Sequence, residues 1–483
     1  MTRCAVRRSL HACAPAIAAL LAGCVVGPDY HRPALSASAG YGAAATASGP
    51  ASPRLASGSD IPAQWWEIFH SSELDDLVAL ALKNSPTVEA AKAALRAARE
   101  QRVAQQGAYY PTISAGLQPS HQDFARSLSS PLESNAEVFD LTTAQVTVAY
   151  TPDLFGANKR AVESLAAQED QQRFQLEAAR LTLASNVVVA AIQDALLRAQ
   201  IDEAKAVVAG QQSTVASFER QLAHGQASST DLATQRALLA QTQAALPSLE
   251  KQFRINRDLL TALVGRTPGE PLEVRFDLRS LSLPDQLPLS LPAQLVEHRP
   301  DVRVAEAQLH AASAQVGVAE AARWPSLEIS GAAGSAAISL LPTFGPEVNF
   351  WNIAATLTQP IYEGGALKHR QRAAEAAYDQ AAAQYQETVV GAFQNTADVL
   401  HALHTDAEGL TVAESAAAVS RRSLEIARRQ FAMGETSALS VLSAEQADHQ
   451  AQSAMLQARA NRYADVAALF QALGGGWWNR RSA

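Results

Sequence analysis

A cysteine at the end of a short apolar run is the residue whose surroundings most clearly predict a chemical modification. Three arginines open the chain, and the apolar run that follows spans about a dozen residues, too short for a bilayer but typical of a secretory signal. The stretch LAGC at 21–24 matches the bacterial lipobox, in which the cysteine is acylated. The pattern predicts a signal peptide at 1–23 and a lipid on Cys24. The alternative is an ordinary signal peptide with a chance cysteine.

The next residue and the net charge bear on where the mature chain acts. Val25 stands where an aspartate would resemble the signal that retains lipoproteins in the inner membrane, so the outer membrane is favoured. Removal of 1–23 takes away two of the three cysteines, three arginines and no acidic residue, so the formal charge moves from −8 to −11. We therefore expect no internal disulfide. We also expect no nucleic-acid partner, because an acidic exported chain binds nucleic acid poorly.

Other groups that could do chemistry give weaker signals. His401 and His404 have a spacing that places metal ligands on one helix face, with Asp398 one turn earlier, but a solvated face is favoured because a third ligand is not convincing. The triple glycine 474–476 lacks the strand, helix and lysine of a phosphate-binding loop, which favours a loose end to the last helix. We expect no metal, no cofactor and no catalytic residue. A cell-envelope hydrolase is the enzyme alternative.

Two halves of the chain repeat each other. The stretch SPTVEAAKAALRAAREQRVAQQGAYYPTIS begins at Ser85, and RPDVRVAEAQLHAASAQVGVAEAARWPSLE begins at Arg299. Later, ERQLAHGQASSTDL and RRQFAMGETSALSV place Gly225 over Gly434. A repeat near 200 residues indicates a duplicated domain. We divide the chain into a signal peptide at 1–23, a lipid anchor and linker at 24–64, a first repeat at 65–265, an equatorial linker at 266–291, a second repeat at 292–474 and a tail at 475–483.

Each half predicts helices around one β-hairpin. Alternating apolar residues between prolines predict hairpins at about 111–152 and 325–360, which gives four strands. Proline-free stretches at 157–224 and 366–433 then predict helices about 100 Å long. Each helix is expected to turn at its glycine and return. Pro247 predicts a kink or break in the first return helix. Heptad spacing near the turns is typical of coiled coils.

Four strands with aromatic residues at their ends suggest a membrane barrel shared between chains. Open strand edges in lipid leave backbone groups unpaired, and eight strands is the usual minimum for closure. Two chains would supply eight strands and three chains twelve, enough for a channel. The alternative is two surface hairpins on a periplasmic protein. The aromatic residues are Tyr109, Tyr110, Phe139, Tyr150, Trp324, Phe350, Trp351 and Tyr362.

Four stretches resemble one family over nearly the whole mature chain. They are CVVGPDYHRP, QWWEIFHSSELDDLVALALKNSP, EHRPDVRVAEAQLHAASAQVGVAEAARWPSLEISG and ALFQALGGGW. They are similar to the TolC-like outer-membrane efflux family, in particular the NodT-type lipoproteins of tripartite pumps. The resemblance implies an α+β membrane protein that forms a homotrimer. A twelve-stranded β-barrel, four strands per chain, would sit in outer-membrane lipid and continue into a long periplasmic α-helical barrel.

The resemblance also implies a function and partners. The chain would be the outer-membrane channel of a tripartite efflux pump, a passive exit duct and not an enzyme. An inner-membrane transporter of the resistance-nodulation-division type would drive the substrates, and a periplasmic adaptor would connect the two. The alternative is that the chain is itself a lipid-anchored periplasmic coiled-coil adaptor or scaffold.

The glycine turns are the candidate sites for docking the adaptor. Gly225 and Gly434 occupy matching places, and Arg220 and Arg429 lie five residues before them, so polar contacts are available. The alternative is that both glycines only cap helices. Family members often carry aspartates near Ser440 and Ser443 that help build a periplasmic gate, whereas here Asp231 holds the matching place in the first half. The candidate gate residues are Asp231, Ser440 and Ser443.

Overall fold

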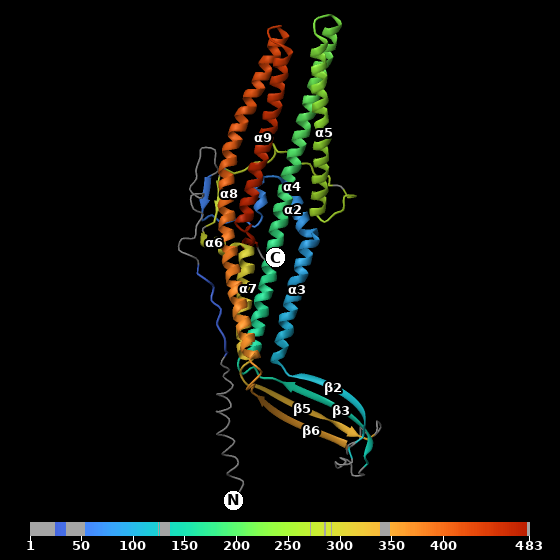
Figure 1. The fold of residues 1–483 in the computed structure, drawn as a ribbon, viewed down its shortest axis with the longest axis vertical. Coiled ribbons are helices and arrows are strands. Elements are labelled where there is room, and N and C mark those ends of the chain that lie inside the picture. The colour runs from blue at the N-terminus through green and yellow to red at the C-terminus, as the bar shows by residue number, and fades with distance from the viewer. Residues whose placement is uncertain are drawn as a thin grey trace. The chain divides into compact units, whose positions relative to one another are not determined.

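The computed structural model of the chain describes residues 25–34, 54–123, 125, 136–270, 272–284, 286–290, 292–338 and 348–480. These residues form two compact units, each assembled from three segments of the chain. The first unit takes the described parts of Met1–Arg32, Leu95–Gln171 and Ala305–Tyr385. The second takes those of Pro33–Ala94, Gln172–Val304 and Gln386–Ala483. Figure 1 labels their helices and strands.

The first unit contains a four-stranded antiparallel sheet in the order β2-β3-β5-β6 (Figure 1). One hairpin comes from each half of the chain, as the alternating apolar pattern predicts. The pair between β3 and β5 joins the two halves, in a register that runs from Thr142 opposite Ala337 to Tyr150 opposite Ile329. The strands are β2 (Thr112–Asp123), β3 (Val138–Tyr150), β5 (Ser326–Ala337) and β6 (Asn349–Thr358).

Parts of four helices complete the first unit. They enter and leave the sheet through prolines and glycines, which end regular hydrogen bonding and turn the chain. A short 3-10 turn at Gly107–Tyr109 leads from the first helix into β2. The helices that contribute are the later part of α3 (Pro86–Gln106), the start of α4 (Ala157–Ala223), most of α7 (Pro300–Ala321) and the start of α8 (Ala366–Ala432).

Two helical hairpins dominate the second unit. The first is α4 with α5 (Ser229–Leu263), and the second is α8 with α9 (Ala438–Ala472). Helices α4 and α8 each run for 67 residues and end within one residue of the predicted boundaries. One window of α4 is long and apolar enough to cross a membrane, but 67% of that window is buried inside the protein. That burial is typical of a core helix.

Pro247 does not break the first return helix, which corrects the prediction of a break at that residue. Helix α5 runs through this proline without interruption. Pro247 is exposed, so its missing N–H leaves the carbonyl one turn earlier free to bind water. The neighbouring turns keep their own hydrogen bonds, and the loss of one bond does not end the helix.

Short elements and the described C-terminal residues pack together in the core of the second unit. Trp65 stacks on Phe470 at a ring distance of 5.3 Å, and both side chains are buried. The triple glycine after α9 is a tightly packed turn, and the prediction of a loose end is wrong. All three glycines have positive φ, and a Cβ on Gly476 would lie 2.3 Å from the Pro62 carbonyl oxygen. The short elements are β1 (Arg54–Ser57), η2 (Trp65–Phe69), α2 (Ser72–Asn84), β4 (Gln286–Leu289), α6 (Pro292–His298) and η6 (Trp477–Asn479).

Candidate functional site

The first hairpin turn joins α4 to α5 and is closed by Gly225. Its φ of +70° is the left-handed conformation that glycine adopts at little cost. The Gly225 N–H donates to the carbonyl of Leu222 (3.0 Å), and the Gln226 N–H donates to that of Gln221 (2.8 Å). This pair of bonds satisfies carbonyls at the end of α4 and reverses the chain.

The second turn repeats the first. Gly434 has a φ of +78°, its N–H donates to the carbonyl of Phe431 (3.0 Å), and the Glu435 N–H donates to that of Gln430 (2.9 Å). Apart from its chain neighbours, a Cβ added at Gly225 or at Gly434 would meet no atom of the described residues within 4 Å. Backbone conformation, and not packing, therefore favours glycine at both positions.

A serine caps the start of each return helix. Each of these serines forms a hydrogen bond with one of the three candidate gate residues. The Ser228 hydroxyl accepts a bond from the Asp231 N–H (3.0 Å) and donates to its carboxylate (2.7 Å). Ser437 accepts from the Ser440 N–H in the same way (3.3 Å). Ser443 is exposed on α9. Within one chain, Asp231 and Ser440 thus have a local capping role, and a gate built from these residues stays a prediction.

The two candidate docking arginines remain at the protein surface. Arg220 donates to the Ser217 hydroxyl (3.1 Å). Arg429 donates to the Glu425 carbonyl (3.2 Å) and lies 4.0 Å from the carboxylate of the same residue. Both arginines are exposed, so their guanidinium groups can also contact a partner.

Apolar side chains bring the two turn regions together. Val215, Phe218 and Leu232 form a buried cluster in the first hairpin, and Phe431 and Ala438 of the second hairpin pack against it. The rings of Phe218 and Phe431 stack at 5.6 Å. The heptad spacing predicted coiled-coil packing near the turns, but it did not indicate that this packing links one hairpin to the other.

Comparison with known proteins identifies the family of this fold. The family model described as "Outer membrane efflux protein" matches residues 77–266 and 291–475, which is most of the chain. The chain belongs to the outer membrane efflux protein family. Its α-helical hairpins and antiparallel sheet agree with that assignment.

Relatives and solved structures extend the match over nearly the whole length. The pyoverdine export outer membrane protein OpmQ of Pseudomonas aeruginosa is 31% identical over 86% of this chain and 88% of that protein. The toluene efflux pump outer membrane protein TtgF of Pseudomonas putida is 28% identical over 96% of both. The solved outer-membrane channel OprN has a TM-score of 0.85 and 26% identity over 94% of this chain and all of that one.

Membership of the outer membrane efflux protein family fixes the general function. The protein is an outer-membrane component of an efflux system, a transport conduit related to the TolC-like channels. The resemblance in the sequence is confirmed, and the alternative of a periplasmic adaptor or scaffold is not supported. The adaptor-docking and gate residues stay predictions.

Sequence reasoning missed an ion pair that spans each hairpin. Glu219 pairs with Arg236 across α4 and α5 (2.7 Å), and Arg428 pairs with Glu445 across α8 and α9 (2.9 Å). The two pairs occupy matching positions of the repeat with the charges exchanged. The Glu445 side chain is only 6% exposed. Aligning charges at the offset that superposes Gly225 on Gly434 would have revealed both pairs.

The residues weighed as metal ligands lie on α8. His404 approaches the Glu408 carboxylate at 3.7 Å. Among the residues that the structure describes, no group of three or more histidine, cysteine or acidic side chains is arranged to hold a metal ion. Cys24 lies outside the described residues, so its lipidation stays a prediction.

A carboxylate pair between α8 and α9 predicts a pH dependence of stability. Burial, together with the charge and hydrogen bond of Asp406, raises the pKa of Asp465 to about 7. A raised pKa means that the folded chain holds a proton that the unfolded chain releases near pH 4. The free energy of unfolding therefore falls as the pH rises through the window from about 4 to about 7.

We expect Asp465→Asn to raise the unfolding temperature at about pH 8 and to leave it unchanged near pH 4. Because the pair is partly exposed, solvent screening reduces the gain to about 1–2 kcal/mol, or about 1–2 °C for a chain of this size. Differential scanning fluorimetry in detergent measures the shift. Asp398→Asn, an exposed carboxylate on α8, is the control. An equal gain at both pH values would contradict the assignment.

Proposed function

We propose that three copies of this chain form one duct, with a twelve-stranded β-barrel in the outer membrane and a helical barrel in the periplasm. The four-stranded sheet carries this proposal. Among the residues that the structure describes, its outer strands β2 and β6 each pair on one side only. Strands of 10 to 13 residues are long enough to cross a bilayer when tilted. Unpaired edges are not tolerated in lipid, so the sheet must close with other copies.

The side chains of the sheet support a membrane location. Large apolar residues point away from the chain, with Trp351 and Ile353 each 75% exposed and Ile113 74% exposed. Such exposure on a sheet is typical of a surface that meets lipid or another subunit. Two copies would close eight strands around a filled interior, whereas three leave room for a channel. A duct therefore favours three.

We expect the detergent-solubilised protein to have the mass of three chains after correction for bound detergent. Light scattering combined with refractive index and absorbance separates the protein mass from the detergent mass. We expect three chains because a barrel with room for a channel requires twelve strands, and each chain supplies four. A monomer or dimer that restores efflux in cells would contradict the shared barrel.

A lipid on Cys24 would anchor the duct in addition to its barrel. Two or three acyl chains bind a membrane far more firmly than one. The mass of the mature N-terminal peptide tests the modification, and Cys24→Ser should remove the lipid mass. An unmodified Cys24 in the native mature protein would refute the lipid while leaving the barrel proposal intact.

The partners proposed are a periplasmic adaptor and an inner-membrane transporter of the resistance-nodulation-division type. The hairpin turns offer an adaptor a matched pair of exposed arginines on two equivalent caps. The relatives named above carry different cargo names, pyoverdine for one and toluene for the other. Similarity of this degree therefore spans several cargoes, and co-purification of the transporter is the experiment that identifies the pump.

A further inference from the structure

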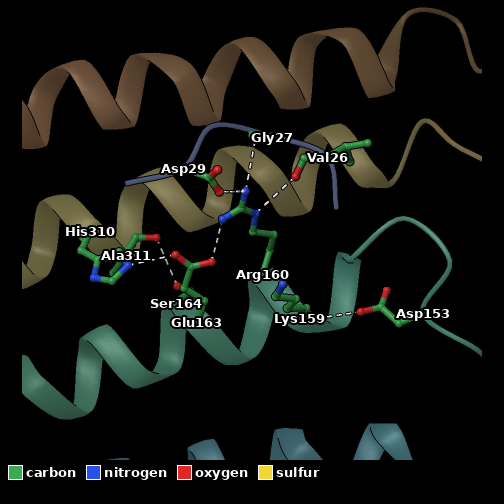
Figure 2. A network of polar contacts seen from close by, with 10 residues as sticks. All are labelled: Val26, Gly27, Asp29, Asp153, Lys159, Arg160, Glu163, Ser164, His310 and Ala311. Atoms are coloured by element: carbon green, nitrogen blue, oxygen red, sulfur yellow. Dashed lines mark hydrogen bonds and ion pairs between the residues drawn. The ribbon is translucent and has the colours of Figure 1, made fainter. Parts of the chain in front are cut away.

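The first described residues of the chain lie against a buried arginine of α4. Arg160 sits at the start of α4, and its side chain is only 4% exposed. Figure 2 shows the guanidinium pointing at the N-terminal segment. It donates to the carbonyls of Val26 (3.2 Å) and Gly27 (3.1 Å) and to the carboxylates of Asp29 (2.8 Å) and Glu163 (2.8 Å).

This arrangement is built around the N-terminal segment. A buried guanidinium needs partners for its N–H groups, because an unpaired buried charge is costly. Three of the four acceptors of Arg160 come from Val26, Gly27 and Asp29. The fourth, Glu163, also contacts His310 at 2.9 Å (Figure 2). Without the segment, Arg160 would keep one of these four partners.

Two glycines make the fit of the segment tight. Gly27 has a φ of +93°, and a Cβ there would lie 2.4 Å from the Cα of Gly317 on α7. A Cβ on Gly317 would lie 2.8 Å from the Cγ of Arg160. The backbone of the segment can therefore approach α7 and reach Arg160 only because both residues lack a side chain.

Further contacts fix the direction of the segment. The Arg32 guanidinium forms two bonds with the Glu306 carboxylate (2.7 and 2.8 Å). The Tyr30 ring stacks on His310 at 4.3 Å. At the other end, the Val26 N–H donates to the carbonyl of Phe155 (3.2 Å), in the link between β3 and α4. The segment thus runs along the helices and ends where the sheet begins.

We propose that Arg160 is a positioning residue that docks the chain's own mature N-terminus and sets the depth at which the lipid on Cys24 enters the membrane. The proposal rests on the proposed function, in which Cys24 is acylated and the sheet crosses the outer membrane. Cys24 precedes Val25 directly, and consecutive Cα atoms are about 3.8 Å apart. The docked segment places Val25, the residue that follows Cys24, beside the link between β3 and α4, which the proposed function puts at the periplasmic rim of the barrel.

The alternative is that Arg160 only stabilises the packing of α4 against α7. A label on the segment separates the two roles. Pro28 is exposed, and acylation consumes the thiol of Cys24, so Pro28→Cys supplies the free thiol for a fluorophore. Labelled protein in liposomes that contain lipids brominated at different depths reports the depth of the segment. Hydrogen exchange of the Val26 amide reports whether the segment is docked.

Two variants loosen the docking from opposite sides. Arg160→Met removes the donors, and Gly27→Ala pushes the segment away from α7 without changing either helix. We expect both to speed exchange of the Val26 amide by about tenfold or more and to broaden the quenching profile. Arg160→Lys keeps the charge and should restore part of the effect. Lys159→Met removes an exposed charge at the adjacent position and should behave as the unmodified sequence.

Each other outcome overturns the proposal in a distinct way. Unchanged exchange in Arg160→Met and Gly27→Ala would mean that Arg160 does not hold the segment. Faster exchange with an unchanged quenching profile would mean that the lipid depth is set elsewhere. An N-terminal peptide without a lipid mass would refute the anchor on which the proposal rests, and the exchange result would still decide whether the segment docks.

Discussion

Cells that carry Gly225→Val together with Gly434→Val should lose efflux although the channel still assembles. Both glycines have positive φ, which costs a side-chain-bearing residue of order 1 kcal/mol. Beyond the chain neighbours, no atom in the described part of the chain lies within 4 Å of an added Cβ at either position, so the variants introduce strain without a clash. That strain is small for a large assembly but acts directly on the path of both turns.

Efflux is expected to be lost if binding of the adaptor depends on the backbone conformation of the turns. Relief of the strain would shift the caps and the exposed arginines Arg220 and Arg429 that precede them. We expect the yield of the adaptor crosslink in cells to fall by about tenfold, which corresponds to about 1.4 kcal/mol of binding free energy. Resistance to an exported compound should fall with it. Trimer yield on gels of unheated membranes is measured in parallel.

A matched double variant controls for the added side chains. Gly391 and Gly409 lie exposed within α8, and a Cβ at either position would meet no described atom within 4 Å outside the adjacent backbone of α8. Gly391→Val with Gly409→Val adds the same two side chains away from the turns and should leave the crosslink unchanged. If the turn variant keeps crosslinking and efflux at the level of the control, the glycines are only helix caps.

The helices and strands could be predicted from local sequence signals, because a proline or glycine ends or turns the backbone at its own position. The start of α4 at Ala157 and its end near Gly225 follow from a proline-free stretch bounded by a turn residue. The four strands follow from apolar alternation between prolines. Pro247 shows the limit of such signals, because one exposed proline does not outweigh the hydrogen bonds on both sides of it.

Contacts between distant segments could not be predicted in the same way. Alternation does not say which strands pair, so the pairing of β3 with β5 came only from the structure. Nothing near Arg160 in the sequence marks it as buried, because its partners at Val26 and Asp29 lie more than 130 residues away. The residues of the turns were found because they repeat, but their local capping bonds depend on three-dimensional geometry.

Arg257→Met should be a strongly destabilising single substitution in the second unit. Arg257 on α5 lies 3.6 Å from the carboxylate of Asp194 on α4, whose side chain is fully buried. It also donates to the carbonyls of Val274 (2.8 Å) and Leu272 in the linker between the halves. One guanidinium therefore joins two helices and the linker.

The expected loss of unfolding free energy comes from the Asp194 carboxylate, which stays buried without its partner Arg257. Burial raises the pKa of Asp194, and the positive charges of Arg257 and Arg198 oppose that rise. Breaking a buried pair by removing one partner costs about 3–5 kcal/mol. For a chain of this size, that corresponds to a fall of about 3–5 °C in unfolding temperature. Without Arg257 the pKa of Asp194 rises further, so the fall should be larger at about pH 8 than near pH 5.

Three further variants separate the charge from the linker bonds. Arg254→Met removes an exposed arginine one turn earlier on α5 and should change little. Asp194→Asn combined with Arg257→Met removes the buried charge, so it should recover most of the loss and all of its pH dependence. The remaining deficit should be about 1–2 kcal/mol, the size expected for the lost bonds to the linker carbonyls.

Scanning fluorimetry of the detergent-solubilised protein at both pH values decides the matter. If Arg257→Met lowers the unfolding temperature equally at both, and Asp194→Asn restores nothing, the linker bonds carry the whole effect. Asp194 would then hold its proton in the folded chain regardless of Arg257. A pH-dependent loss that the double variant abolishes would instead establish an ionised carboxylate, buried between two helices and held in that state by Arg257.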